Sequence, residues 1–203
     1  MFGIGQKRGT AKAAAKPATL HSIAAMMRGR TFTGYFNIGG GNRNYYFSYS
    51  PAKAAVAGGK LAITGGLRLA GAGSNFRNTP HELRDVRATL VAAQGGIGTA
   101  PPRKKLPSEI APANPDLPIV ESTGSLSFCG VLYFKLAPLD GRALGVPADM
   151  RQVQLNVRMA PVNDVERGLQ GAFSSIADAL YGDSINQSLA EASVTELNKL
   201  LAG

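Results

Sequence analysis

The chain has 203 residues, of which 44% are hydrophobic and 17% charged, with 25 glycines, 12 prolines and no tryptophan. These proportions exclude a low-hydrophobicity disordered chain, and no stretch approaches the ~20 consecutive apolar residues that span a bilayer. The glycine and proline content favours many turns and short strands over a helical bundle. A chain of this length can bury a core without disulfides or metals, so we expect one globular domain.

Positive charge is concentrated in the first part of the chain. Residues 1–81 contain 11 basic and no acidic residues, whereas residues 82–203 contain 11 basic and 13 acidic ones, so +11 and −2 give the net charge of +9. This uneven field favours an anionic partner for the N-terminal part, either a nucleic acid or an acidic protein surface. The alternative is that basic and acidic segments meet, within one chain or between the subunits of a homo-oligomer.

Residues 1–30 are predicted as a basic N-terminal arm. Its alanine-rich composition predicts a short helix from Thr19, as the N-cap, through Met27, with Pro17 interrupting any helix upstream. The single Cys129 cannot form an internal disulfide, and the N-terminus lacks an apolar stretch long enough for a secretory signal. We therefore expect a cytoplasmic protein, or a mature protein whose targeting segment is missing.

Apolar and polar residues alternate with a period of two from Thr31 onward, which predicts β-strands. The runs cover residues 31–38, 43–50, 61–69, 85–90, 126–136 and 152–159. Strands of a parallel sheet buried on both faces would be continuously apolar, so these runs predict an antiparallel sheet. Residues 39–42, three glycines and an asparagine, predict a hairpin turn, and the pair Gly65 and Gly66 predicts a bulge.

We predict residues 31–161 as one antiparallel β domain, either a β-sandwich or a partly open barrel. A proline-rich loop, residues 95–118, interrupts this domain. The loop contains a basic cluster that is a candidate partner contact, formed by Arg103, Lys104 and Lys105.

The period becomes helical over residues 162–203. Asn163 followed by Glu166 resembles a capping box and predicts the start of one amphipathic helix. Similar signals at Ser184 and Ser193 predict two further short helices. We expect these helices to pack as a hairpin on the β domain, which gives a mainly β fold of the α+β class.

Residue patterns that carry catalysis are sparse. The two histidines, His21 and His81, have no metal-ligand spacing, and no nucleophile or phosphate-binding motif is present. Glu82, Asp85 and Glu121 are kept as candidates for a carboxylate pair, because sequence spacing does not fix distance in space. We predict a protein that is not an enzyme and has no catalytic residue, cofactor or metal.

The stretch from Gly34 to Ser50 combines aromatic and basic residues. Aromatic rings on a sheet in a positive field suit single-stranded nucleic acid, because bases stack on rings while cations neutralise phosphates. The candidate contacts there and just downstream are Arg43, Tyr45, Tyr46, Tyr49, Lys53 and Lys60. The alternative is that one aromatic face fills the core and the other lies beneath a helix.

Over these 17 residues the pattern resembles the paired aromatic strands of cold-shock and other OB-type domains. The glycine that this family has between its first two aromatics is missing, Ser48 stands in place of its histidine, and nothing downstream matches. The leading hypothesis is thus a domain that acts by binding or assembly through its basic region. A single-stranded nucleic-acid-binding module is the second.

Overall fold

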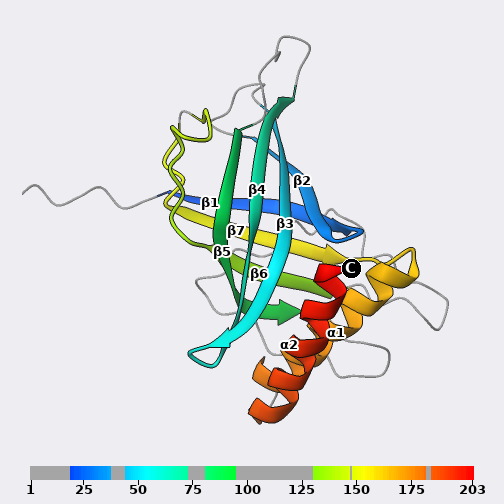
Figure 1. The fold of residues 1–203 in the computed structure, drawn as a ribbon. Helices are drawn as coiled ribbons and strands as arrows, with labels where there is room; N and C mark the ends of the chain where they lie inside the picture. The colour runs from blue at the N-terminus through cyan, green and yellow to red at the C-terminus, as the bar shows by residue number, and fades with distance from the viewer. Residues whose placement is uncertain (1–18, 38–43, 73–80, 95–129, 147, 182–183) are drawn as a thin grey trace, which may run out of the picture.

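The chain forms seven strands followed by two helices in the computed structural model, which describes residues 19–37, 44–72, 81–94, 130–146, 148–181 and 184–203. The elements are β1 (Leu20–Arg28), β2 (Thr31–Asn37), β3 (Asn44–Ala57), β4 (Lys60–Ala72), β5 (His81–Gln94), β6 (Gly130–Leu136), β7 (Gln152–Met159), α1 (Asp164–Tyr181) and α2 (Gln187–Ala202). Figure 1 shows the helices side by side, next to one end of the strands. The predicted mainly β fold with C-terminal helices is confirmed.

The sheet closes into a barrel and does not form a sandwich. Each strand pairs antiparallel with the next one along the chain, from β1–β2 to β6–β7. β1 then pairs parallel with β7, from Leu20↔Gln152 to Met26↔Arg158. This last pairing uses the backbone groups that two edge strands would leave unpaired, so the barrel is closed and not partly open. It also differs from the five-stranded barrel of OB-type domains.

The short helix predicted between Thr19 and Met27 is wrong, because this segment forms β1. Ile23, Ala25 and Met27 are buried, and the residues between them are more exposed. Alanine and methionine favour a helix locally, but as a strand this segment forms hydrogen-bonded ladders with both β2 and β7. Tertiary pairing overrides local propensity here.

The inward face predicted for β7 is confirmed, and of the two faces that the sequence left open for β3, the one with Tyr45, Phe47 and Tyr49 fills the core. Side chains that are 6% exposed or less point into the core from Tyr45, Phe47, Tyr49, Val153, Leu155 and Val157. The outward face of β7 is not fully exposed to solvent, since Gln154 is 0% and Asn156 4% exposed. Gln154 donates to Asn156 at 2.6 Å, and Asn156 donates to Ser22 of β1 at 3.0 Å, so the buried amides are hydrogen-bonded.

Two glycines allow the backbones of neighbouring strands to approach closely. A Cβ on Gly65 would lie 2.1 Å from the carbonyl oxygen of Ser50, and one on Gly34 would lie 2.1 Å from that of Ala24. A side chain cannot be accommodated so near a backbone oxygen, which explains glycine at both positions. The β4–β5 register shifts just after Gly65, which confirms the bulge predicted there.

α1 begins at its predicted cap and packs into one end of the barrel. Asn163 Oδ1 accepts a hydrogen bond from the backbone N–H of Glu166 at 2.9 Å. Phe173 packs against Phe32 of β2 and Phe134 of β6, with ring centroids 5.9 and 6.2 Å away. All three rings are 1% exposed or less, so this cluster joins the helix to the barrel interior.

α2 is one continuous helix, so the predicted division into two short helices is wrong. Its N-cap is Asn186, whose side chain accepts a backbone N–H at 3.0 Å, and not the predicted Ser184. The helix continues through Ser193 because one buried stripe runs along it, formed by Ala190, Val194, Leu197 and Leu201. Asn198 fixes α2 to β3, accepting the N–H of Ala54 at 2.7 Å and donating to its carbonyl at 2.9 Å.

The segment that joins β6 to β7 packs at the N-terminal end of β7, away from the helices. Apolar side chains of this segment belong to the same core as the strands, namely Leu139, Leu144, Val146 and Met150. Each is 7% exposed or less. Side chains therefore fill the barrel from both ends, and functional contacts are to be sought on its outside.

Several predicted features lie outside the described residues. These are the arm upstream of Thr19, the turn at residues 39–42, the loop 95–118 and residues 126–129 of the fifth predicted strand. β5 is longer than the predicted run of residues 85–90, because its pairing with β4 continues to His81.

Candidate binding surface

Two tyrosines form an aromatic pair on the outside of the barrel. Tyr35 of β2 lies directly opposite Tyr46 of β3, and their rings meet edge to face with centroids 5.4 Å apart. Phe32 and Phe47 belong to the opposite faces of the same two strands and point into the core. Tyr35 is 65% exposed and Tyr46 is half-buried. A ring as exposed as Tyr35 adds little to the core and is accessible to a planar ligand.

A shallow depression of about 390 Å³ lies beside this pair. Ala24 and Met26 of β1 and Thr33 of β2 contribute small or uncharged side chains to it. Arg28 and Arg158 also line it. The closure of the barrel brings the second arginine to this place, because Met26 of β1 pairs with Arg158 of β7. The depression thus combines aromatic rings, an apolar floor and two guanidinium groups from four strands.

Both helices hold the turn that follows Arg28. Gly29, which has φ +56°, donates its N–H to Glu166 Oε1 of α1 at 2.7 Å. Arg30 Nε donates to the carbonyl oxygen of Leu200 at 2.6 Å, near the C-terminal end of α2, where a positive charge also interacts favourably with the helix dipole. Contacts from two helices fix the turn and thereby the backbone of Arg28 at the rim of the depression.

Glu166 brings a negative charge to the inner side of this turn. The residue is 2% exposed, and burial by itself raises the pKa of its carboxyl. Hydrogen bonds from the N–H groups of Gly29 and Val162, together with the positive charge of Arg28, favour the ionised form and hold the pKa below its usual value. The rim of the depression and the start of α1 are therefore coupled electrostatically.

Two tyrosines that were predicted to stack on nucleic acid lie inside the barrel. Tyr45 is 6% exposed and Tyr49 is 0% exposed. The Tyr49 hydroxyl donates to the carbonyl of Val86 at 2.8 Å and lies 3.2 Å from that of Ile63, and burial raises its pKa. Because both rings fill the core, this part of the prediction is corrected: Tyr46 alone of the three predicted tyrosines reaches the outer surface.

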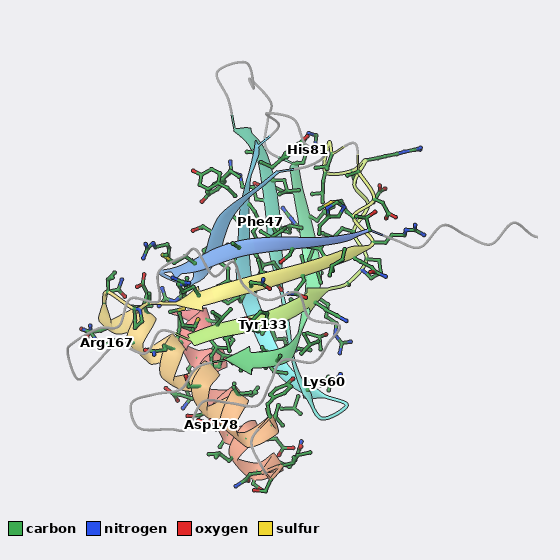
Figure 2. All side chains as sticks on the ribbon, turned by 180° about the vertical axis from the view of Figure 1, so that it is seen from behind. Phe47, Lys60, His81, Tyr133, Arg167 and Asp178 are labelled. Carbon is green, nitrogen blue, oxygen red and sulfur yellow. The ribbon has the colours of Figure 1, made fainter. Side chains whose placement is uncertain are left out.

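The predicted basic contacts do not gather at the depression. Lys53 and Lys60 are exposed, but Lys60 lies at the β3–β4 turn, as Figure 2 shows. Tyr46 is near the other end of β3, so a rise of about 3.3 Å per residue separates it from Lys60 by about 35 Å along the strand. The remaining predicted basic contacts lie outside the described residues, namely Arg43, Arg103, Lys104 and Lys105.

Three residues of the surface were not among the predicted contacts. Tyr35 alternates in step with Thr31 and Thr33, so the sequence pattern already placed it on the other face of the strand from Phe32. Arg28 and Arg158 are 130 positions apart in the sequence and meet only through the parallel β1–β7 pairing. No local pattern signals that pairing.

A second depression, of about 370 Å³, crosses β3, β4 and β5. It includes Arg68, which forms an exposed ion pair with Glu82 at 3.4 Å. Arg84 also lines this depression, which has no aromatic residue among the described residues that line it.

The carboxylates that were candidates for a catalytic pair do not form a recognisable active site in the described part of the chain. Glu82 pairs with Arg68, and Glu121 lies outside the described residues. Within these residues, no group of three or more histidine, cysteine, aspartate or glutamate side chains is placed to hold a metal ion.

Comparison with known proteins supplies no relative from which a function could be transferred. No protein-family model matches the chain, and neither a curated protein nor a solved structure matches it. Among the helices that the structure describes, none has the length and apolar character needed to cross a membrane.

Proposed function

We propose that this protein is a non-enzymatic binding domain that holds an anionic partner on the outside of its barrel, at the depression between the tyrosine pair and Arg28 with Arg158. The single observation that carries this proposal is that both arginines line one depression beside the tyrosine pair, in which Tyr35 is exposed. A guanidinium group binds phosphate and carboxylate groups well, because its planar fork of N–H donors matches their geometry.

The charge of the first four strands as a whole supports the same partner class. In the described parts of β1 to β4 and their turns there are five basic residues, Arg28, Arg30, Lys53, Lys60 and Arg68, and no acidic one. A surface with one sign of charge raises the local concentration of counter-charged partners and accelerates their association. Such attraction weakens as salt is added.

A polyanion without bases or side chains tests this proposal. We expect end-labelled inorganic polyphosphate to bind at low salt and to bind more weakly as salt increases. The double variant Arg28→Gln/Arg158→Gln should weaken binding. The control Lys60→Gln/Arg142→Gln loses the same charge at exposed positions away from the depression and should bind nearly as the parent does. No binding at low salt, or equal losses in both variants, would refute the proposal.

Assembly is a second candidate, favoured by the separation of charge between strands and helices. The described residues of α1 and α2 include five acidic side chains, Asp164, Glu166, Asp178, Glu191 and Glu196, against Arg167 and Lys199. The acidic helices of a second copy are then the anionic partner of the basic strands. Sedimentation over a range of concentrations tests this candidate: a coefficient that rises with concentration and falls with salt supports it, and a monomer throughout refutes it.

A further inference from the structure

We infer that the partner at this depression is single-stranded nucleic acid, with a base stacked on Tyr35 and the backbone phosphates next to Arg28 and Arg158. This inference rests on the proposed function and names the class of its anion. It differs from the interpretation of the sequence in the residues that perform the stacking, because Tyr45 and Tyr49 are in the core.

The register of the strands sets the spacing between the ring and the cations. Tyr35 pairs with Ala24 of β1, and Ala24 pairs with Asn156 of β7, two positions before Arg158. Neighbouring strands are about 4.8 Å apart and the rise along a strand is about 3.3 Å per residue, so the backbones of Tyr35 and Arg158 are about 12 Å apart. Ala24 occupies the space between them with a single methyl group. This gap, lined by the uncharged side chains of Ala24 and Met26, is on the scale of one nucleotide.

The aromatic pair distinguishes a nucleic acid from other anions. A partner recognised by charge alone requires only Arg28 and Arg158, and an exposed tyrosine beside them would add nothing. Tyr35 remains 65% exposed although Tyr46 contacts its ring, so enough of the ring is accessible for a base. Stacking is tolerant of sequence because every base has a π face, which predicts binding with little sequence preference.

The shape of the depression favours a single strand over a duplex or a small nucleotide. It is a shallow surface feature formed by the outer faces of strands, whereas sites for small molecules are concave and enclose most of the ligand. A duplex keeps its bases stacked on one another, so they are not available to Tyr35. A single strand offers unstacked bases and a flexible backbone to such a surface.

Three labelled probes of equal length test the inference on the full chain: a thymidine single strand, an abasic strand with the same backbone charge, and a duplex. We expect the thymidine strand to bind most tightly. Tyr35→Ala should weaken its binding about tenfold or more while leaving the abasic strand almost unchanged. Tyr35→Phe keeps the ring and should retain binding, which separates stacking from hydrogen bonding by the hydroxyl.

Salt dependence tests the phosphate contacts separately. On a single strand each phosphate contact contributes about 0.7 to the slope of log affinity against log salt. The variant Arg28→Gln/Arg158→Gln should therefore have a slope shallower by about 1.4 in magnitude, whereas Lys60→Gln/Arg142→Gln should leave the slope nearly unchanged. Thermal unfolding of each variant confirms that the barrel is intact.

The outcomes separate this inference from the proposed function. If thymidine and abasic strands bind equally and Tyr35→Ala has no effect, or if the duplex binds best, the inference of a stacked single strand is overturned while the binding of anions stands. If polyphosphate and all three probes fail to bind at low salt, both the inference and the proposed function fail. If only a second copy of the chain binds, assembly replaces the nucleic acid.

Discussion

Glu166 of α1 accepts a hydrogen bond at 2.7 Å from the backbone N–H of Gly29, a residue that lies 137 positions earlier in the chain. The same carboxylate accepts the N–H of Val162 at 2.8 Å. It thereby joins the turn between the first two strands to the start of the helical hairpin. Arg28, which precedes the turn, lines the candidate binding surface, so this contact links the stability of the fold to the position of the surface.

We predict that Glu166→Gln lowers the free energy of unfolding by about 1.5 to 3 kcal/mol at neutral pH, the range for hydrogen bonds to a charged group. The pKa of Glu166 is lowered in the folded protein, so its contribution is present above the unfolded value of 4.5 and is lost as pH falls through the folded value. The stability of the variant should therefore decline less steeply in acid. Urea titrations between neutral and acidic pH measure this.

Glu196→Gln is the matched control for that experiment. Its carboxylate is exposed on α2 and pairs only with Lys199 among the contacts described, at 3.1 Å. Exposed ion pairs contribute about 0 to 1 kcal/mol, so this variant should follow the parent closely. Equal acid profiles for Glu166→Gln and the parent would show that the buried carboxylate does not stabilise the turn.

Phe173→Ala should destabilise the protein by about 3 to 5 kcal/mol, because it leaves a cavity beside Phe32 and Phe134. Leu189→Ala removes an apolar side chain that is 45% exposed on the neighbouring helix, and it should cost about 0.5 kcal/mol or less. Chemical denaturation of the two variants provides the comparison. Similar losses would mean that α1 is not anchored in the barrel by this ring.

Two adjacent glycines allow a test of the bend in β4. A methyl group at Gly65 would lie 2.1 Å from the carbonyl oxygen of Ser50, whereas one at Gly66 meets nothing within 4 Å. Gly65→Ala should therefore cost about 1 to 3 kcal/mol through strain. Gly66→Ala should be neutral or stabilise by up to about 1 kcal/mol, because alanine restricts the unfolded chain. Melting temperatures of the two variants test this explanation. A higher melting temperature for Gly65→Ala than for Gly66→Ala would contradict it.

Tyr181 provides a prediction at alkaline pH. Its hydroxyl donates to the carbonyl oxygen of Leu90, and burial raises its pKa from 10.0 to about 12. The folded state therefore resists ionisation, and the stability from this group is present below pH 10 and lost as pH rises towards about 12. Tyr181→Phe should lower the free energy of unfolding by about 1 kcal/mol at neutral pH. Between pH 9 and 11 the stability of this variant should decline less than that of the parent.

Tyr35→Phe is the appropriate comparison for this alkaline test. The ring of Tyr35 is 65% exposed, and the variant should change neither the stability at neutral pH nor its alkaline decline. Unfolding free energies at several alkaline pH values measure both variants. An unchanged decline in Tyr181→Phe would contradict the assigned hydrogen bond and burial.

Most strands could be predicted from the sequence, because alternation is a local property. Val153, Leu155 and Val157 face inward as their spacing requires. β1 could not be recognised, since the alanines and methionines around Ile23 favour a helix locally and become a strand through two long-range pairings. The closure of the barrel is not visible either, because a sandwich and a barrel share the same alternation.

The candidate surface was predictable only in part, for the same reason. Tyr46 was identified, but alternation could not decide which face of β3 fills the core and which faces solvent, so Tyr45 and Tyr49 were assigned to the wrong side. Arg158 reaches the surface through a pairing between the first and last strands. A residue brought to a site by chain closure leaves no local signal in the sequence.

The parallel ladder between β1 and β7 also determines how the chain can fold during synthesis. Leu20 finds its partner Gln152 only after a further 132 residues have been synthesised, and the helices that follow emerge later still. Until then β1 has an unsatisfied edge on the nascent chain, exposed to other strands. A topology with such a distant strand pairing folds slowly, and the unpaired edge of β1 is open to non-native pairing until β7 has been synthesised.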